Sequence, residues 1–246
     1  MKSSGNSRRI SSKAAKVRRR KGFGKVVIIS SPSGGGKTTI CRQLLAHNPD
    51  WEFSVSYTTR PMRQDEVNGR EYFFVETPEF LGLGKAGFFA EAAKVHLHYY
   101  GTPRRPLEKA IEDGRVILLD VDVQGAASIR KKYPQALSIF ILPPSKAELK
   151  RRLKFIMIYK DLGKYRPSKA ELKRRLKHRG TETKAQLDVR LANAIKEVKE
   201  FTRFDYVIIN EDINEAVAAA DHMIKSWTVG VTYFGRNKST AYSVNQ

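Results

Sequence analysis

A strand-like run, a glycine-rich turn and a helix-like pattern follow one another early in the chain, and this order constrains the fold more than any other feature. Residues 25–30 (KVVIIS) are β-branched and almost uninterruptedly apolar, which is typical of a strand buried on both faces in a parallel sheet. The turn at residues 30–39 (SSPSGGGKTT) consists mostly of small residues, and Ile40, Leu44 and Leu45 then recur with helical spacing. We therefore expect a strand, a loop and a helix in direct succession.

The glycine-rich turn has the composition of a phosphate-binding loop. Small residues allow backbone N–H groups to surround an anion, a lysine reaches the β- and γ-phosphates, and a hydroxyl binds Mg²⁺. Gly34–Gly36, Lys37 and Thr38 supply these three groups in turn. Ser31 stands where the strict pattern G-x-x-x-x-G-K-[ST] has its first glycine, so the pattern fails at one residue while its strand-loop-helix context fits. The alternative is a glycine-rich connection with a chance lysine. The predicted nucleotide-binding residues are Ser31, Pro32, Ser33, Gly34, Gly35, Gly36, Lys37, Thr38 and Thr39.

Buried strands alternate with helices along the rest of the chain. Further strands are expected at residues 115–122 (RVILLDVD), 136–144 (ALSIFILPP) and 204–210 (FDYVIIN). Helices are expected at residues 103–113, 183–201 and 211–227. This alternation predicts an α/β fold in which helices cover both faces of a mostly parallel sheet, with ligands bound at the carboxyl ends of its strands.

A polar loop lies between two strand-like runs, residues 53–59 (FSVSYTT) and 71–75 (EYFFV). It ends in Asn68-Gly69, which indicates a hairpin, and Thr77-Pro78 then indicates the start of a helix. Arg60 and Arg63 within the loop are spaced so that both could bind one phosphate. The alternative for these arginines is a charged surface hairpin.

Two acids, Asp120 and Asp122, end the second buried strand. Beside a phosphate loop, such acids hold Mg²⁺ through water. A helix N-cap or a solvated strand end are the alternatives.

Composition and charge place limits on the rest. The 246 residues, 41% of them hydrophobic, suffice for one α/β domain with appendages. Residues 1–25 hold ten Lys or Arg and no acid, a large part of the net charge of +21. We interpret residues 1–24 as a disordered solvated arm, with a contact to anionic polymers or an organelle-targeting segment as alternatives. No apolar run approaches 18 residues and Cys41 has no partner, so we expect a cytoplasmic protein without a membrane contact or a disulfide.

An eleven-residue segment occurs twice. PSKAELKRRLK stands at 144–154 and again at 167–177, which leaves residues 155–177 as an insert. Two copies are too few for a solenoid, so we interpret the repeat as a local tandem duplication or a sequence-assembly artefact.

Together, SSPSGGGKTT, SVSYTTRPMR with EVNGREYFFV, YYGT, ILLDVDVQG and RGTET with a later RL resemble the guanylate kinases over about residues 25–227. The resemblance implies a P-loop NTPase-type parallel sheet, a small α+β subdomain that binds GMP at about residues 55–105, and a mobile lid at about 174–195. It also implies transfer of the γ-phosphoryl group of ATP to GMP with Mg²⁺. It leaves the tail, residues 228–246, without a role.

The resemblance assigns site residues one by one. It implies GMP-phosphate contacts by Arg60, Arg63, Tyr72 and Tyr100, and guanine contacts by Ser56, Glu91 and Thr102 with Asp122 nearby. It implies lid arginines at Arg175, Arg179 and Arg190, with Arg179 and Asn210 on the ATP side. The expected catalytic residues are Lys37, Arg60, Arg63, Arg175 and Arg190, and the expected metal ligands are Thr38 and, through water, Asp120. A carboxylate at Glu91 suits guanine because it accepts from N1–H and N2–H together, whereas adenine presents the reverse polarity.

Two residues depart from the family pattern, and two other functions compete. Ser31 replaces a glycine, and Ala92 replaces an aromatic residue beside the guanine-binding acid, which leaves the packing near GMP open. A non-catalytic guanylate-kinase-like binding module is disfavoured by the intact Gly36-Lys37-Thr38. A kinase for another phosphorylated acceptor is disfavoured by Ser56 and Glu91.

Overall fold

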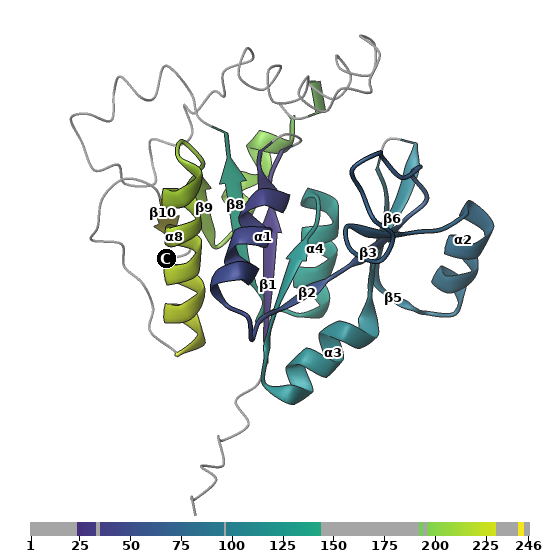
Figure 1. The fold of residues 1–246 in the computed structure, drawn as a ribbon, viewed down its shortest axis with the longest axis horizontal. Helices are drawn as coiled ribbons and strands as arrows, with labels where there is room; N and C mark the ends of the chain where they lie inside the picture. The colour runs from purple at the N-terminus through teal and green to yellow at the C-terminus, as the bar shows by residue number, and fades with distance from the viewer. Residues whose placement is uncertain are drawn as a thin grey trace, which may run out of the picture.

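A six-stranded sheet forms the centre of the protein, and a four-stranded sheet lies beside it (Figure 1). The computed structural model describes residues 24–32, 35–95, 97–143, 192–193, 196–229 and 241–243. The central sheet has the order β10-β9-β8-β1-β7-β2, and all its pairings are parallel except that of β10. Its strands are β1 (Lys25–Ser30), β2 (Glu52–Ser54), β7 (Val116–Asp120), β8 (Leu137–Leu142), β9 (Tyr206–Ile209) and β10 (Ala241–Ser243).

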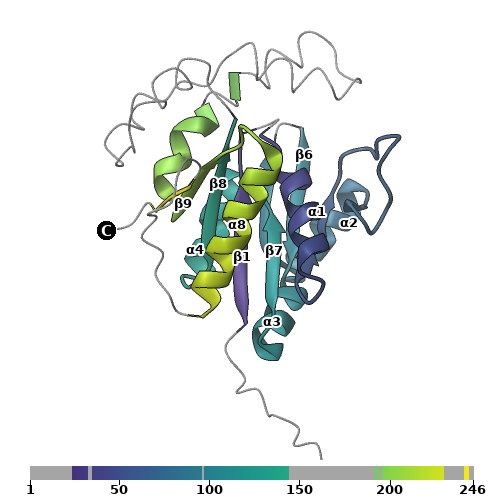
Figure 2. The same cartoon turned by 60° about the vertical axis from the view of Figure 1, so that its left-hand side comes forward.

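Helices cover both faces of this sheet, as the alternation of strands and helices predicts (Figure 2). On one face, apolar residues of α1 (Lys37–His47) and α8 (Ile213–Thr228) pack against alternate residues of β1 such as Val27 and Ile29. On the other face, α3 (Arg104–Asp113), α4 (Val123–Lys132) and the 3-10 helix η2 (Lys199–Arg203) pack against Val26 and Ile28. Strand β1 is therefore buried on both faces, which explains its almost uninterrupted apolar sequence.

The four-stranded sheet belongs to a small subdomain that the chain enters and leaves through adjacent strands. Its order is β4-β3-β6-β5, with strands β3 (Ser56–Thr58), β4 (Tyr72–Phe74), β5 (Phe89–Val95) and β6 (His98–Pro103). Helix α2 (Thr77–Lys85) packs on it through Phe80, which stacks on Phe89 at 4.6 Å between ring centroids. Pro78 lies in the first turn of α2, as predicted.

The predicted hairpin around Asn68-Gly69 is wrong. Strands β3 and β4 pair in parallel, with Ser56 opposite Tyr72 and Thr58 opposite Phe74. Thirteen residues separate the two strands, which is enough chain to return to the start of β3 before β4 begins, and this return makes the strands parallel. The Asn68-Gly69 turn instead closes locally: Gly69 has φ 82°, and its N–H donates to the carbonyl of Tyr72 at 2.8 Å.

The run FSVSYTT also departs from expectation, because it is divided between the two sheets. Its first part, β2, pairs with β7 in the central sheet, and its second part, β3, pairs with β4 and β6 in the small one. Val55 alone separates β2 from β3. Strands β5 and β6, which pair antiparallel, were not expected from the sequence.

The remaining predictions fall partly inside the described residues. Helix α3 ends before Gly114, and α8 fills the predicted helix 211–227. Residues 192–193 and 196–198 of the expected helix 183–201 are helical, and η2 follows them. Within the tail, Ala241–Ser243 form β10, antiparallel to β9. The arm before Gly24 and the insert 155–177 lie outside the described residues. No helix in the described part of the chain is long and apolar enough to span a membrane.

Candidate active site

The glycine-rich turn connects β1 to α1 and leaves the N-terminus of α1 open. Gly36 is the N-cap of α1, and no side chain caps this end among the described residues. Uncapped N–H groups at the first turn of a helix, together with the helix dipole, bind phosphate. Lys37 and Thr38 begin the helix, and Lys37 Nζ lies 3.4 Å from the carbonyl oxygen of Ser31, back across the loop. The structure thus forms the predicted strand-loop-helix unit.

Two close approaches fix the shape of the loop. Gly36 has φ 97°, a left-handed conformation that favours glycine, and a β-carbon there would lie 2.5 Å from Asn210 Nδ2. The Asn210 amide, 5% exposed at the end of β9, donates to the Gly35 carbonyl at 3.2 Å. Ser31 Oγ donates to the Pro32 carbonyl at 2.8 Å, so the serine that replaces the first glycine of the strict phosphate-loop pattern stabilises the turn. Asn210 thereby lies beside the loop, on the side expected for ATP.

A hydroxyl, a carboxylate and an ammonium group meet at the carboxyl ends of β1 and β7. Thr38 Oγ1 donates to Asp120 Oδ2 at 2.9 Å, and Lys37 Nζ lies 3.8 Å from Asp120 Oδ1. Thr38 and Asp120 offer the hard oxygen atoms that Mg²⁺ binds. The described residues contain no cluster of three or more His, Cys, Asp or Glu that could form a metal cage. A magnesium ion that takes one or two protein oxygens and completes its shell with phosphate and water fits this donor set.

The two loop arginines converge on one carboxylate. Arg60 donates to both oxygens of Glu66, at 2.9 and 2.7 Å, and Arg63 NH1 lies 3.6 Å from Glu66 Oε1. The Arg63 N–H also donates to Glu66, at 2.8 Å. Burial raises the pKa of Glu66, but the hydrogen bonds and charges of Arg60 and Arg63 outweigh burial and lower it, so Glu66 stays ionised. The arginines are therefore held in one place by an anion of the protein itself.

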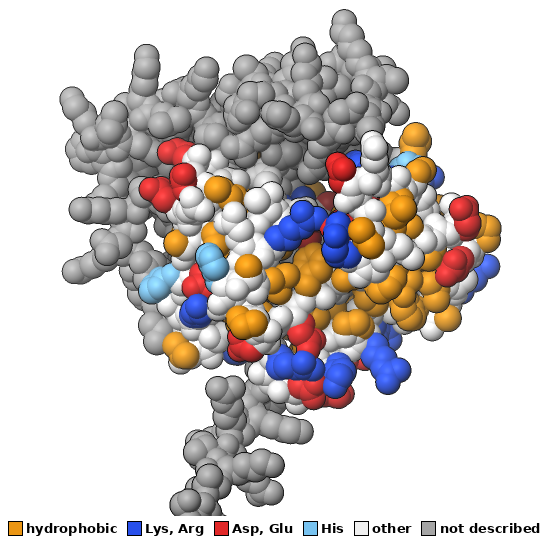
Figure 3. All heavy atoms as spheres, in the orientation of Figure 1, with side chains coloured by type: hydrophobic (Ala, Val, Ile, Leu, Met, Phe, Trp, Pro, Cys, Tyr) orange, Lys and Arg blue, Asp and Glu red, His pale blue; other side chains and the backbone are white. Residues whose placement is uncertain are grey.

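Aromatic rings surround Arg60 on the small sheet. Its guanidinium lies 5.5 Å from the ring centroids of both Tyr72 and Phe74, and Tyr72 packs edge-on against Tyr100 at 5.9 Å. Burial lowers the pKa of Arg60, whereas Glu66 and Tyr100 raise it by more, so the net shift is upward. Figure 3 shows basic side chains where α1 faces the small subdomain. Arg60, Tyr72 and Tyr100, three of the residues predicted to bind the GMP phosphate, therefore lie together.

The expected GMP-binding residues of the small sheet lie on one of its faces. Residues opposite each other on paired strands point to the same face, and the direction alternates along each strand. Ser56 pairs with Tyr72, Thr58 with Phe74 and Tyr100, and Glu91 with Thr102. The face therefore carries the expected residues Ser56, Tyr72, Glu91, Tyr100 and Thr102.

Ala92 is paired with Gly101, so it lies on the opposite face from Glu91. That face carries Tyr57, Phe73 and Phe89, and the helix residue Phe80 packs on it. The missing family aromatic thus belongs to the side of α2, away from Glu91. The departure at Ala92 leaves the proposed guanine face intact.

Glu91 is the carboxylic acid at this face whose pKa departs furthest from its usual value. It is 7% exposed, and Thr102, which is fully buried, donates its hydroxyl hydrogen to Glu91 Oε1 at 2.6 Å. Burial raises its pKa, the Thr102 hydrogen bond opposes the rise, and the charge of Asp122 adds to it, so the pKa of Glu91 is about 7. Asp122 is the N-cap of α4 through Oδ1, which accepts from Gly125 N–H at 2.8 Å. Its Oδ2 is buried without a hydrogen-bond partner among the described residues.

Sequence reasoning did not find the acids that hold the acceptor loop. Glu66 binds Arg60 and Arg63 as described, and Glu71 accepts from Arg42 of α1 at 2.6 Å and from Arg70 at 2.7 Å. The available signal was an acid three residues after Arg63, at a position compatible with any polar loop. The predicted residues Ser33, Gly34, Arg175, Arg179 and Arg190 lie outside the described residues.

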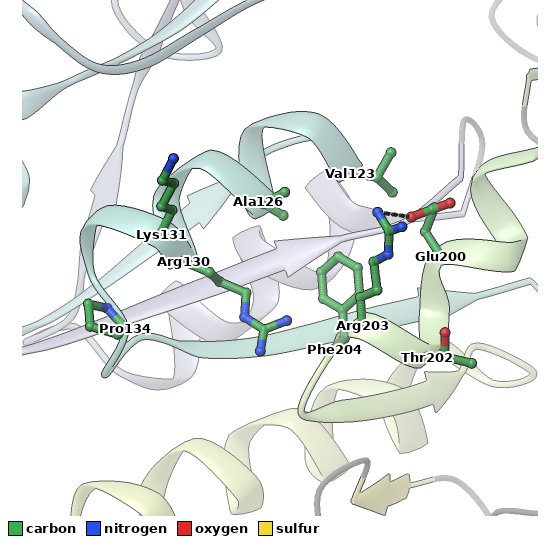
Figure 4. A pocket seen from close by; sticks show the side chains of 10 residues that line it. Val123, Ala126, Arg130, Lys131, Pro134, Glu200, Thr202, Arg203 and Phe204 are labelled. Atoms are coloured by element: carbon green, nitrogen blue, oxygen red, sulfur yellow. Dashed lines mark ion pairs between the residues drawn. The ribbon is translucent and has the colours of Figure 1, made fainter.

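A hollow of about 550 Å³ lies away from these residues, between α4 and η2 (Figure 4). Arg130, Lys131 and Thr202 line it, and Arg203 pairs with Glu200 at its rim at 2.7 Å. Arg130 also lies 3.6 Å from Asp205. Because its arginines have carboxylate partners and the phosphate loop does not reach it, we do not assign a ligand to this hollow.

The parallel sheet, the open helix N-terminus and the arginine-bearing subdomain define a P-loop kinase that phosphorylates a nucleotide. The Guanylate kinase family pattern matches residues 23–160 and 165–227. A guanylate kinase of Nitratidesulfovibrio vulgaris is 42% identical over 193 residues, which cover 78% of this chain and 82% of the relative. One of Thermotoga maritima is 39% identical over 209 residues, which cover 85% and 90%.

A solved structure agrees. The crystal structure of guanylate kinase from Anaplasma phagocytophilum aligns with a TM-score of 0.61 at 31% identity and covers 84% of this chain and 87% of that one. The chain belongs to the guanylate kinase family, and it is an enzyme, a nucleoside-monophosphate kinase. The resemblance stated from the sequence is confirmed, and a non-catalytic binding module is not favoured.

Proposed function

We propose that this chain phosphorylates GMP with ATP through the residues that line the phosphate loop and one face of the small sheet. The observation that carries the proposal is the arrangement of Lys37, Thr38 and Asp120 at the open N-terminus of α1, with Arg60 and Arg63 converging on one anion in the facing subdomain. Donor and acceptor phosphates, four negative charges or more, would meet between these two groups. The positive groups of such a site offset the repulsion between these phosphates and so lower the barrier to transfer.

On the donor side, the phosphate loop holds ATP. Backbone N–H groups at the start of α1 bind its phosphates, and Lys37 compensates the charge of the β- and γ-phosphates. Asn210 donates to Gly35 and so supports the loop on the adenosine side. The lid arginines Arg175, Arg179 and Arg190 are proposed to close over the transferring group.

Mg²⁺ is the proposed cofactor. The Thr38 hydroxyl would bind it directly, and Asp120, hydrogen-bonded to that hydroxyl at 2.9 Å, would bind it through water. When bound, the ion neutralises charge on the β- and γ-phosphates. Asp120 also orients Thr38 and lies close to Lys37, so one carboxylate aligns both groups.

On the acceptor side, an oxygen of the GMP phosphate attacks the γ-phosphorus. The bond between that phosphorus and the β–γ bridging oxygen breaks, and ADP and GDP result. A nucleotide phosphate with a second pKa of about 6 is mostly a dianion at neutral pH, so the attack requires no general base. Arg60, Arg63, Tyr72 and Tyr100 are proposed to bind this phosphate and hold it in line.

Guanine is proposed to bind between Glu91 and Ser56. The Glu91 carboxylate accepts from N1–H and N2–H, which adenine cannot offer. Thr102 gives its hydroxyl hydrogen to Glu91, so we assign the hydrogen bond to guanine O6 to Ser56. Asp122, with Oδ2 free among the described residues, is a second acceptor near the exocyclic amine.

A coupled ADP-release assay with GMP, AMP, CMP and UMP as separate acceptors tests the proposal. We expect turnover with GMP at least about 10²-fold above that with the other three, because buried polar groups left unpaired discriminate strongly. Equal turnover with AMP would place the base in a different environment from Glu91. The assay repeated after EDTA treatment tests the magnesium assignment, and readded Mg²⁺ should restore the rate.

A further inference from the structure

Two carboxylates meet over the one residue of the first turn of α4 that has no side chain. Gly125 is the third residue of α4 and is buried, and its N–H donates to Asp122 Oδ1. A β-carbon built at Gly125 would lie 3.2 Å from Glu91 Oε2 and 3.3 Å from Asp122 Oδ1. Both distances are tighter than most contacts of a β-carbon, so the carboxylates would have to shift by a few tenths of an ångström.

The backbone does not require a glycine at this position. Positive φ angles occur among the described glycines at Gly36, Gly69, Gly87 and Gly114, and Gly125 is not one of them. Glycine is also a poor helix former, because it loses more conformational freedom on folding than other residues. Local helix stability therefore favours alanine at residue 125, and the reason for glycine must lie in what surrounds it.

We propose that Gly125 determines specificity for guanine by letting the Glu91 carboxylate lie against the first turn of α4 beside Asp122. The proposal rests on the guanine site proposed above. Thr102 holds the other oxygen of Glu91, Oε1, at 2.6 Å, so the carboxylate cannot yield to a methyl group without turning. The N-terminal end of a helix also favours a nearby negative charge, and only a residue without a side chain allows this approach.

A turned carboxylate would lose one of its two purine contacts. Guanine discrimination depends on both oxygens of Glu91 facing N1–H and N2–H together, and a displacement of a few tenths of an ångström at Oε2 disturbs this pairing. A third neighbour, Val121 Cβ, would lie 3.2 Å from the added carbon. That contact is between apolar groups and affects stability, whereas the contact with Glu91 affects the binding of GMP.

The test is the Gly125→Ala variant of the full chain. We expect the KM for GMP to rise about tenfold with little change in kcat. The Tm should change little, because the gain in helix propensity and the crowding against Val121 act in opposite directions. The preference for GMP over IMP, which lacks the 2-amino group, should shrink. The matched control is Gly82→Ala in α2, an exposed helical glycine where an added carbon meets no atom within 4 Å, and its kinetic constants should not change.

A double-mutant cycle with Glu91→Asp separates a positioning role from a packing role. Aspartate is one methylene shorter and makes room for the methyl group, so Gly125→Ala should raise KM less in that background than in the wild type. Additive effects, or a Gly125→Ala protein that fails to fold while Gly82→Ala folds, would overturn the inference. If Glu91→Gln leaves GMP preferred, the guanine site itself is misplaced. If Glu91→Gln removes the preference while Gly125→Ala keeps the wild-type KM, only the inference about Gly125 fails.

Discussion

The hydroxyl of Thr102 and the carboxylate of Glu91 form a 2.6 Å hydrogen bond between facing residues of β6 and β5. Both side chains are buried, so this bond is shielded from water and holds the carboxylate in one orientation. Burial nevertheless outweighs the bond and leaves the pKa of Glu91 at about 7. The proposed guanine acceptor therefore changes its charge close to neutral pH.

The KM for GMP should depend on pH through Glu91. Only the ionised carboxylate accepts two hydrogen bonds, and around a pKa of about 7 its fraction falls roughly tenfold between pH 8 and pH 6. We expect KM to rise by a similar factor over this range. GMP itself titrates near pH 6, so the comparison is with Glu91→Gln, whose profile should keep only the nucleotide's contribution. The charges facing Glu91 come from Asp122, the N-cap of α4, and from Lys132 in its last turn. Identical profiles for wild type and variant would contradict the assignment.

Ionisation of Glu91, which should favour GMP binding, should at the same time lower the stability of the fold. The pKa of Glu91 is higher in the folded chain than its usual 4.5, so the folded state binds the proton more tightly. Its contribution to the free energy of unfolding is present at low pH and is lost as the pH rises through about 7. Glu91→Gln should reduce this dependence, which chemical denaturation at pH 5 and pH 8 measures.

Replacing Lys37 by alanine should lower kcat by about 10²–10³-fold, because it removes a fixed positive charge from the donor phosphates. The ammonium group is 3.4 Å from the Ser31 carbonyl, and Lys37 is not one of the buried residues that form the apolar core of the described chain, so the Tm should change little. Single-turnover rates and thermal melts check both statements. Near-normal turnover in a folded variant would remove the phosphate loop from the mechanism.

Glu66→Gln should raise the KM for GMP about three- to tenfold, since Arg60 and Arg63 lose the anion that holds them in place. Asp65→Asn, an exposed acid of the same loop, is the control for the lost charge. A lower KM in Glu66→Gln would show instead that this carboxylate competes with the GMP phosphate for the arginines.

Deleting residues 1–22 should leave kcat and KM unchanged, because the proposed site contains no residue from the arm. The truncation keeps Gly24, which packs closely against α3: its N–H donates to the Ile111 carbonyl at 2.9 Å, and an added β-carbon would clash with the Ala110 carbonyl. Binding to heparin at low salt should weaken in the truncated chain if the arm contacts anionic polymers. A large drop in turnover would show that the arm contributes to the site.

Deleting residues 155–177 should keep activity and raise solubility. Because the two copies are identical, the deletion places Arg152 of the first copy where Arg175 of the second stands. It also removes the apolar run Ile156–Ile158, which would aggregate if exposed. Turnover and sedimentation of the two chains compare them directly, and a deletion variant that cannot fold would show the insert to be part of the core.

The buried strands were predictable because burial on both faces gives a continuous apolar run, as in β1 and β8. Strand β5 (FAEAAKV) was not, because its alanines and Glu91 are equally compatible with a helix, and only pairing with β6 makes it a strand. The division of the run FSVSYTT into two strands at Val55 was not predicted for a similar reason. No local signal distinguishes a strand that continues from one that changes its sheet.

The residues of the candidate site differ in the same way in how far the sequence predicts them. Residues in a contiguous motif, such as Lys37 and Thr38, could be assigned from spacing alone. The role of Glu66 depends on the fold of the loop, which places its carboxylate within hydrogen-bond distance of Arg60. The proximity of Gly125 to Glu91 depends on contacts between segments 34 residues apart in the chain. Such relationships follow from tertiary packing, which a single sequence does not state.

The position of Val55 between the two sheets affects how the two proposed nucleotide sites can move relative to each other. The chain enters the small subdomain at Val55 and leaves it at the junction of Pro103 and Arg104. Each point lies two residues beyond the pair Tyr57–Gly101 in neighbouring antiparallel strands, so the two crossings are side by side. A body joined at two adjacent points retains one easy rotation, about the line through them. The acceptor phosphate would therefore approach the donor along an arc set by the backbone. In this structure the Arg42–Glu71 ion pair joins α1 to the acceptor loop across the gap that the arc would close.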